Sequence, residues 1–279
     1  MGALLVAGAI GACREPATPE IPPLTTATPD AAPLATVVVA QAVDGEAGAG
    51  APARSILADV GASPVRALFF DTPAKLEGGQ CERVLVAVVK GPVTAMGETL
   101  AIGDVLAVSN ALGIDVTGKG TVLRASIEIP NCAVLSALPA TKAVVRAAAA
   151  PKLEWARGTM SAHLDVTASP KSPSPSPELY LGRLEGTASV AEHDHPTSWE
   201  VLATLEASGS FVVDGLEARL AARQIVMIPP GTKHAWRPDP GSKLVAIQMY
   251  APPGPELRFG ALAAAEKSAV KDAGTRDAH

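Results

Sequence analysis

The sequence predicts an all-β protein, and two observations lead to this class. Short runs of β-branched and apolar residues, bounded by glycine and proline, recur along the chain; examples are residues 84–89 (VLVAVV), 105–108 (VLAV), 224–228 (QIVMI) and 244–247 (LVAI). Such runs between turn signals are typical of β-strands. Helical periodicity is scarce, because only residues 144–150 (VVRAAAA) and 262–270 (LAAAEKSAV) look helical, and both are expected at the periphery.

The chain begins with an apolar, uncharged segment, residues 1–12 (MGALLVAGAIGA), which ends at Cys13. This segment is too short to span a bilayer, which needs about 20 residues, but it fits the apolar region of a secretory signal. Residues 10–13 (IGAC) resemble a bacterial lipobox, in which the cysteine is acylated after cleavage just before it. No Lys or Arg precedes the apolar run, so a start upstream and an ordinary buried segment are the alternatives.

The lipoprotein interpretation predicts a signal over residues 1–13, acylation of Cys13 and a place in the cell envelope, periplasmic or at the surface. Membrane contact would then be made only through the lipid anchor. Residues 14–53 are rich in Pro, Ala, Thr and Gly and lack the large apolar side chains that offset the entropy lost on ordering. They predict a disordered tether, apart from residues 35–40 (ATVVVA), which could form one strand.

The clearest domain boundary lies at residues 169–177 (SPKSPSPSP), within a predicted linker over residues 151–177. Alternating prolines cannot occupy a central strand and favour extended conformations. The formal net charge is −5 and no run of Lys or Arg occurs, so a nucleic-acid partner is not expected. The sequence also lacks a G-x-S-x-G nucleophile motif and a Cys-x-x-Cys pair. The expected partner is a small molecule, and the chain could form a homodimer.

Three of the five histidines and one carboxylate, His193, His195, Glu200 and His234, have the spacing of a single metal site. A His-x-His pair on a β-strand directs both imidazoles to the same face, because side chains alternate with a period of two. His234 follows a Pro-Pro-Gly turn from a later strand. Three imidazoles and one carboxylate suit divalent Mn, Fe, Co, Ni, Cu or Zn. A lone histidine is more often a surface or core residue, but four ligand-type residues together predict a metal centre.

These residues resemble the two motifs of the cupin superfamily, roughly G-x5-H-x-H-x3,4-E-x6-G and G-x5-P-x-G-x2-H-x3-N. Gly186 lies one residue early and Gly209 two residues late, while Arg223 stands where a Gly is usual and Pro238 where an Asn is usual. All four metal-binding positions of the motifs are filled. The resemblance covers residues 178–260 and implies a double-stranded β-helix (jelly-roll) barrel that binds the metal.

A weak internal repeat extends the resemblance to a bicupin, although chance similarity between two strand-turn-strand stretches is the alternative. Residues 82–91 align with residues 200–209, and residues 103–108 with 223–228. The repeat predicts a first barrel over residues 54–150, a metal-binding barrel over 178–260 and a C-terminal helix or tail over 261–279.

The first copy is expected to be a degenerate barrel without metal. In this alignment Lys75 and Glu77 take the places of His193 and His195, Ile114 takes the place of His234, and only Glu82 is retained, opposite Glu200. The remaining cysteines, Cys81 and Cys132, could form a disulfide in an oxidising compartment. Sequence alone cannot show whether the two lie within bonding distance.

The sequence predicts the metal site more clearly than the reaction that takes place there. Cupins with this ligand set include dioxygenases, decarboxylases, isomerases and sugar-binding proteins, and the fold does not choose between them. We expect either a metal-dependent enzyme, oxygenase- or decarboxylase-like, acting on a small anionic or polyhydroxy molecule, or a ligand-binding or sensing protein. The candidates for a general acid or base are Glu206, Glu217, Arg219 and Tyr250, and no spacing singles one out. His163 could be a further ligand or a surface residue.

Overall fold

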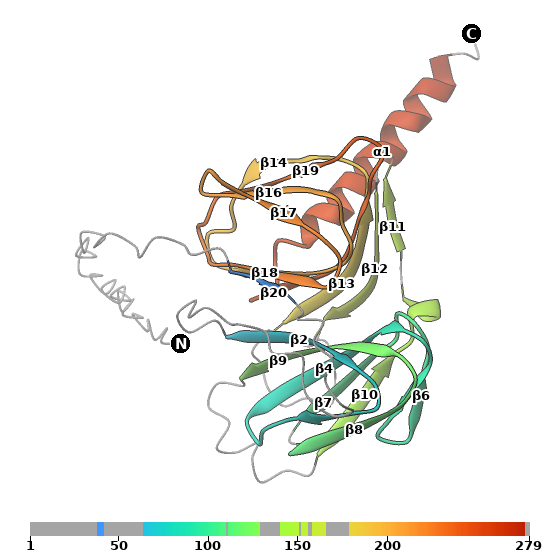
Figure 1. Cartoon of the computed structure of the whole chain (residues 1–279). Helices are drawn as coiled ribbons and strands as arrows, with labels where there is room; N and C mark the ends of the chain where they lie inside the picture. Colours follow the sequence, from blue (N-terminus) through green and yellow to red (C-terminus); the bar gives the residue numbers. More distant parts are fainter. Residues whose placement is uncertain are drawn as a thin grey trace, which may run out of the picture. The chain divides into compact units, whose positions relative to one another are not determined.

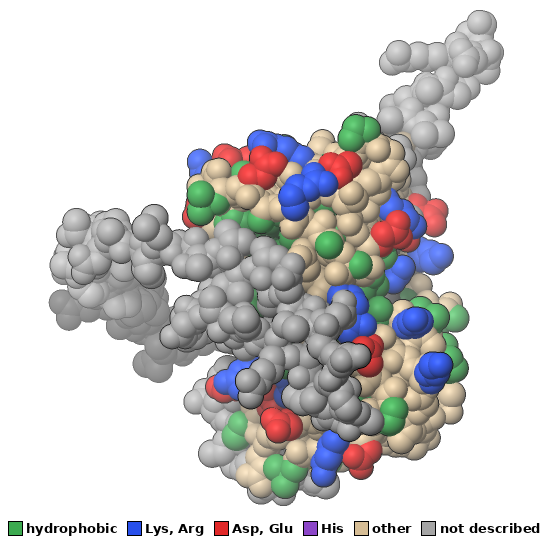
Figure 2. Space-filling model, in the orientation of Figure 1, with side chains coloured by type: hydrophobic (Ala, Val, Ile, Leu, Met, Phe, Trp, Pro, Cys, Tyr) green, Lys and Arg blue, Asp and Glu red, His purple; other side chains and the backbone are tan. Residues whose placement is uncertain are grey.

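The computed structural model describes residues 38–41, 64–109, 111–128, 140–150, 152–155, 158–165 and 179–276. Within them, two pairs of antiparallel sheets form two jelly-roll barrels (Figure 1), as the fold class predicted. No helix among these residues has both the length and the apolar character needed to cross a membrane. In Figure 2, basic and acidic side chains are interspersed over the face drawn, so the described part of that face carries no continuous patch of one sign.

The N-terminal barrel consists of a five-stranded sheet, in the order β10-β7-β4-β9-β2, and a four-stranded sheet, in the order β3-β8-β5-β6. Its strands are β2 (Val65–Asp71), β3 (Ala74–Glu77), β4 (Glu82–Lys90), β5 (Val93–Ala95), β6 (Glu98–Leu100), β7 (Val105–Ser109), β8 (Gly113–Gly118), β9 (Thr121–Glu128) and β10 (Thr141–Val145). One buried apolar cluster takes side chains from both sheets and fills the space between them.

The C-terminal barrel consists of a seven-stranded sheet, in the order β1-β18-β15-β20-β13-β12-β11, and a four-stranded sheet, in the order β14-β19-β16-β17. Its strands are β1 (Val38–Gln41), β11 (Lys152–Trp155), β12 (Gly158–Asp165), β13 (Tyr180–Gly186), β14 (Val190–His193), β15 (Trp199–Glu206), β16 (Gly209–Val213), β17 (Leu216–Leu220), β18 (Gln224–Ile228), β19 (His234–Pro238) and β20 (Leu244–Ala251). A second apolar cluster lies between these two sheets.

The long apolar runs of the sequence are strands that are buried on both faces. In β4, Val84 and Val86 belong to the cluster inside the barrel, whereas Leu85 and Ala87 belong to a cluster on the other face of the sheet. Alternate side chains therefore enter two different cores, which removes the apolar–polar alternation of a half-exposed strand. That outer cluster also contains residues of β15 and β20, so one core draws on the large sheets of both barrels.

Three segments differ from or refine the sequence-based expectation. The linker predicted over residues 151–177 contains β11 and β12, two strands of the large C-terminal sheet, because both pair in the ladder β13-β12-β11. The strand expected within residues 35–40 is present as β1, which pairs with β18. Residues 144–150 were expected to be helical, and this is wrong: β10 ends at Val145, and only a short 3-10 helix, Ala147–Ala149, follows. The β-branched Val144 and Val145 pair with β7 at the sheet edge, so local sheet pairing overrides the alanine-rich composition.

Helix α1 (Leu257–Arg276) begins four residues before the predicted C-terminal segment and is more than a peripheral element. Its Phe259 is buried and stacks on Trp155 of β11, with ring centroids 5.5 Å apart. Tyr180 and Tyr250 complete this small aromatic cluster. The cluster fixes the first turn of the helix beside the large sheet of the C-terminal barrel, where the helix forms one wall of a cavity.

Candidate metal centre

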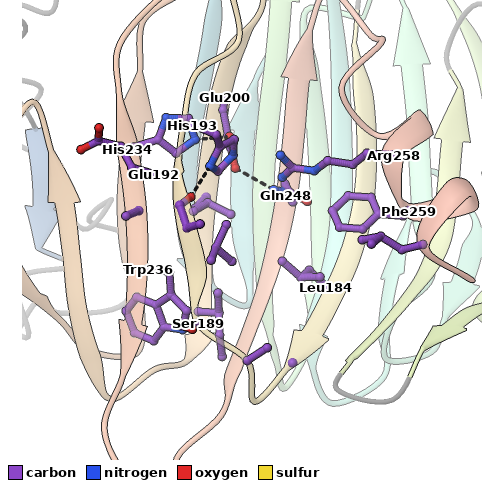
Figure 3. Close-up of a pocket in the computed structure, with 18 of the residues that line it drawn as sticks. Leu184, Ser189, Glu192, His193, Glu200, His234, Trp236, Gln248, Arg258 and Phe259 are labelled. Carbon is purple, nitrogen blue, oxygen red and sulfur yellow. Dashed lines mark hydrogen bonds and ion pairs between the residues drawn. The ribbon is translucent and has the colours of Figure 1, made fainter. Parts of the chain in front are cut away.

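His193, His195, Glu200 and His234 converge in the C-terminal barrel, and their potential ligand atoms all lie within 4.8 Å of one another. Oε2 of Glu200 lies 2.9 Å from Nε2 of His195 and 3.0 Å from Nε2 of His234. Two ligand atoms that lie about 2.1 Å from one ion, at right angles, are about 3.0 Å apart. These two distances match neighbouring positions in the coordination shell of a transition metal; Figure 3 labels His193, Glu200 and His234 of this cluster.

Three segments bring these side chains together. His193, the last residue of β14, lies opposite His234, the first residue of β19, and Glu200 lies in β15. Strand alternation was expected to place both His193 and His195 on one strand, and this is correct only for His193, because β14 ends there. His195 is held instead by its backbone carbonyl, which accepts a hydrogen bond of 2.9 Å from the N–H of Gly231.

Backbone carbonyls fix the tautomers of two of the histidines. Nδ1 of His193 donates to the carbonyl of Ala191, and Nδ1 of His234 donates to the carbonyl of Thr232, each over 2.9 Å. A carbonyl can only accept, so Nδ1 carries a proton in both rings. In neutral His193 this leaves the lone pair on Nε2, which faces the cluster, whereas Nε2 of His234 faces Oε2 of Glu200. Nε2 of His193 is buried and has no hydrogen-bond partner among the described residues. A divalent metal would accept the lone pair of this nitrogen. The residues therefore fit the metal ion that the cupin resemblance implies.

The electrostatics of the site also favour a cation. Burial alone would raise the pKa of Glu200, but hydrogen bonds from His195 and His234 outweigh it and hold that pKa well below its usual range. Burial lowers the pKa of His193 and keeps its imidazole neutral. For His234, burial is outweighed by the Glu200 carboxylate, which raises the pKa of the imidazole. An ionised carboxylate therefore lies beside a neutral imidazole.

The cluster opens onto a cavity of about 1140 Å³. Its walls are mainly apolar, and its aromatic and larger aliphatic lining residues are Trp155, Leu184, Leu202, Phe211, Trp236, Leu244, Phe259 and Leu262. Gln248 and Arg258 are polar lining residues that lie beside the cluster in Figure 3. The other polar side chains of the lining, apart from the cluster itself, are Ser189, Glu192, Arg237 and Glu266. The site is thus accessible to a ligand far larger than a water molecule.

Sequence reasoning missed Gln248 and Arg258. Nε2 of Gln248 donates a 2.6 Å hydrogen bond to Oε1 of Glu200. A lone amide within the apolar run of residues 244–251 was an available signal, because buried polar groups need partners. Arg258 carried no such signal, since nothing in the sequence shows that the first turn of α1 reaches the cavity.

None of the acid and base candidates from the sequence is among the residues that line the cavity, although Tyr250 lies beside the ligand cluster. Glu206, Glu217 and Arg219 have exposed side chains paired with Lys243, Arg237 and Asp239, respectively. Tyr250 is buried beside the cluster, with its ring centroid 5.2 Å from that of His195. Burial raises the pKa of the Tyr250 hydroxyl far above its ordinary value, so the group stays protonated.

The other residues singled out in the sequence lie elsewhere. Glu192 and Asp194 are exposed beside the cluster, as expected for solvated neighbours. His163 belongs to β12, and its side chain lies outside what the structure describes. Cys81 is disulfide-bonded, while Cys13 and Cys132 both lie outside the described residues, so the Cys81–Cys132 pairing stays a prediction.

Strand pairing corrects the alignment of the two barrels. In the N-terminal barrel Leu76 lies opposite Ile114, as His193 lies opposite His234 in the C-terminal barrel. Val84 lies opposite Val108 of β7, the position that Glu200 takes opposite Ile228 of β18. The counterparts of His193, Glu200 and His234 are therefore Leu76, Val84 and Ile114, all buried in the apolar core.

The alignment of Ile114 with His234 was right. The alignment of Lys75 with His193 and that of Glu82 with Glu200 were wrong. Glu82 lies two residues before the counterpart of Glu200. A shift of two residues along a strand leaves every side chain on the same face, so the apolar pattern could not reveal the error. Glu82 instead forms an ion pair with Arg124 of β9.

Comparisons with known proteins show the fold and no closer relationship. No family model and no curated protein matches the chain. A mutant of Bacillus subtilis oxalate decarboxylase matches with a TM-score of 0.50 and 11% identity, over 67% of this chain and 69% of that one. Vicilin from hazelnut (Corylus avellana) has a TM-score of 0.50 and 13% identity, over 71% and 77%. Lactobacillus farciminis oxalate decarboxylase in complex with formate has a TM-score of 0.50 and 13% identity, over 68% and 77%.

The strand order, the ligand cluster in the C-terminal barrel and these structural matches lead to the same assignment. The chain has the cupin fold, and its C-terminal barrel contains a three-histidine, one-glutamate group that can hold a metal ion.

Proposed function

We propose that the chain is a metal-dependent enzyme, oxygenase- or decarboxylase-like, that acts on a small anionic or polyhydroxy molecule outside the cytoplasm. One observation carries the proposal: the four ligand-type residues border a cavity of about 1140 Å³. Structural metal sites are usually closed by protein ligands, whereas catalytic sites keep a position open to substrate. The metal would be Mn, Fe, Ni, Cu, Co or Zn.

The residues of the chain have separate roles in this proposal. His193, His195, Glu200 and His234 would hold the ion, which supplies Lewis acidity or electron transfer to O₂ when bound. Gln248 orients the Glu200 carboxylate through its hydrogen bond. The apolar walls of the cavity exclude water from the bound substrate and so strengthen charge interactions at the site.

The alternative function is a non-catalytic ligand-binding or sensing protein. It is favoured by the scarcity of acid and base groups: of the described residues, the carboxylates that line the cavity besides Glu200 are Glu192 and Glu266, and the Glu192 side chain is 56% exposed. A binding protein needs no proton-transfer group, whereas most decarboxylation and isomerisation mechanisms require one.

Activity and binding can be separated with one panel of compounds. The metal-loaded full chain is incubated with small carboxylates and sugars while O₂ uptake, CO₂ release and product formation are followed. Turnover that disappears on chelation and in the His193→Ala/His195→Ala variant supports the enzyme. Metal-dependent binding without any product over long incubation contradicts the enzyme and supports the binding protein.

The proposal includes a bicupin, with two barrels built on one duplicated plan and the N-terminal one free of metal. The strand order β7-β4-β9-β2 parallels β18-β15-β20-β13, and β3-β8-β5-β6 parallels β14-β19-β16-β17. A structural match over 67% of the chain is longer than either barrel alone, so it includes residues of both. Leu76, Val84 and Ile114 offer no ligand atoms at the positions equivalent to the metal cluster.

The proposal also places the protein in the cell envelope, anchored by acylation of Cys13, with residues 14–53 as a tether. The apolar residues 1–12 and the lipobox-like IGAC sequence support it. An oxidising compartment would suit a disulfide between Cys81 and Cys132. Membrane fractionation and mass spectrometry of the mature N-terminus test this directly, since Cys13→Ala must release the protein from the membrane fraction if the anchor exists.

A further inference from the structure

We propose that the ligand of the cavity is an organic carboxylate with an extended aliphatic or aromatic body, and that Arg258 of helix α1 selects its carboxylate. The inference rests on the proposed function, because it names the substrate class of the same site. It depends on three features of the cavity. Two cations line it outside the metal cluster, and of these Arg237 pairs with Glu217, whereas Arg258 has no ion pair with a carboxylate of the described residues. Arg258 lies beside the metal cluster, and most of the remaining wall is apolar.

Arg258 is the second residue of α1 and lines the cavity. Its Nη2 donates a 3.0 Å hydrogen bond to the hydroxyl of Tyr250, and its guanidinium lies 5.0 Å from the ring centroid of Phe259. These contacts hold the side chain in place but use few of its five N–H donors. Among the described residues, no carboxylate forms an ion pair with Arg258, so its charge is available to an anionic ligand.

The guanidinium lies on the same side of the cavity as the metal cluster. Figure 3 shows the Arg258 side chain extending from the helix toward Gln248 and Glu200. Tyr250, which Arg258 contacts, also lies against the cluster, with its ring centroid 5.2 Å from that of His195. A carboxylate between the metal cluster and Arg258 would meet positive charge on both sides. A planar guanidinium matches the geometry of a carboxylate.

The rest of the cavity fits an apolar body. Leu184 and Trp236 lie away from Glu200 in Figure 3, and Trp155 and Phe259 form a stacked aromatic wall. Polyhydroxy ligands are disfavoured, because hydroxyl groups against such walls would lose water without gaining hydrogen bonds. A dicarboxylate of two carbons would leave most of the cavity of about 1140 Å³ unfilled. The walls therefore narrow the proposed substrate class to carboxylates with substantial apolar surface.

Helix α1 supplies this selectivity from outside the barrel strands. Five residues of α1 line the cavity and recur at the spacing of one helical face: Arg258, Phe259, Leu262, Ala265 and Glu266. The first turn of the helix thus supplies the cation that recognises the carboxylate, Arg258, and Phe259, while Leu262 and Ala265 of the following turns add apolar surface for the ligand body. Arg258 is a specificity-determining residue, distinct from the metal ligands.

Binding is measured through the fluorescence of Trp155 and Trp236, which line the cavity. The metal-loaded full chain is titrated with octanoate, with 1-octanol as the neutral analogue and with oxalate as a carboxylate that has no hydrocarbon chain. We expect octanoate to bind at least about tenfold more tightly than either, since hydrogen bonds to charged groups are worth this much. Arg258→Gln should weaken octanoate binding by at least about tenfold and leave 1-octanol binding unchanged, and Arg258→Lys should restore part of the difference.

Arg66→Gln, which removes the same charge from an exposed position in the N-terminal barrel, is the matched control and should bind octanoate like the parent. Equal binding of octanoate and 1-octanol, tightest binding of oxalate, or equal octanoate binding by Arg258→Gln and Arg66→Gln would each overturn the inference. Metal content, measured on the same samples, separates the two proposals. Normal metal with no effect of Arg258 refutes this inference alone, whereas Arg258-dependent binding by a chain that takes up no metal refutes the metal-dependent function alone.

Discussion

The side-chain amide of Gln248 donates a 2.6 Å hydrogen bond to Oε1 of Glu200, and Oε2 of the same carboxylate faces His195 and His234. The amide thereby fixes which oxygen of Glu200 is presented to the cluster. Outer partners of this kind orient the ligands of a metal and typically contribute 10- to 100-fold, roughly, to metal affinity.

Replacing Gln248 by Met keeps the length of the side chain and removes the hydrogen bond. We expect metal affinity to fall by roughly 10- to 100-fold, because the Glu200 carboxylate is no longer held in one orientation. Competition with a chromophoric chelator measures the change. The control is Gln224→Met, which alters a buried glutamine at the start of β18 that accepts a hydrogen bond from the Ala221 N–H. This change should leave metal affinity unchanged. Equal affinity in parent and Gln248→Met would show that Gln248 does not position the ligand.

Ile114 is fully buried in the N-terminal barrel, at the counterpart of His234. Ile114→Ala should lower the free energy of unfolding by about 2–5 kcal/mol, through lost burial and the cavity left behind, without changing the metal content of the chain. Urea denaturation with parallel elemental analysis checks both. Leu112→Ala, at a residue that is 73% exposed, should cost less than about 0.5 kcal/mol. Loss of metal in Ile114→Ala at full folding would contradict a purely structural N-terminal core.

Arg124 is a buried cation whose Nη2 lies 3.1 Å from both carboxylate oxygens of Glu82. Its other donors bond the carbonyl of Glu77 and the hydroxyl of Ser126. Glu82→Gln should lower the free energy of unfolding by about 3 kcal/mol, because it leaves a buried charge without its partner. The double variant Glu82→Gln/Arg124→Met should recover part of this loss. A double-mutant cycle in urea tests the coupling, and strict additivity of the two changes would contradict it.

Arg219 and Ser208 bond the carboxylate of Asp239 and lower its pKa to about 2. Because the folded-state pKa lies below the unfolded value of about 4, the stabilisation is present above pH ~4 and is lost as the pH falls toward 2. The urea midpoint of Asp239→Asn should therefore lie below that of the parent at pH 6, and the two should converge near pH 2. Asp115→Asn changes an exposed aspartate with no ion pair among the described residues. Its urea midpoint should match that of the parent at both pH values. A constant difference across pH would refute the ion-pair explanation.

The fold class was predictable because strands buried on both faces leave continuous apolar runs between turns, as in residues 84–89 and 224–228. The helix expected over residues 144–150 failed because pairing of Val144 and Val145 with β7 outweighs local helical preference. Arg223 illustrates how a motif departure is accommodated. The residue stands where a glycine is usual and adopts a positive φ of 64°, which glycine takes without strain. Its counterpart in the N-terminal barrel, Gly103, has a φ of 87°.

The metal ligands were predictable because ligand-type residues at motif spacing are rare by chance, and the structure brings all four together. The groups that contact these ligands were harder to predict from the sequence. The bond from Gly231 to His195 and the approach of Arg258 depend on how loops and the helix pack, which leaves no periodic signal in the sequence. The register of the two barrels was misread by two residues at Glu82, since such a shift preserves the inward and outward faces of a strand.

The most direct test of the metal centre is elemental analysis of the purified full chain beside the His193→Ala/His195→Ala variant, after both have been exposed to the same mixture of divalent metals. We expect close to one equivalent of Mn, Fe, Co, Ni, Cu or Zn in the parent and none in the folded variant. The absence of metal from the parent, or equal metal in both proteins, would contradict a metal centre at His193, His195, Glu200 and His234.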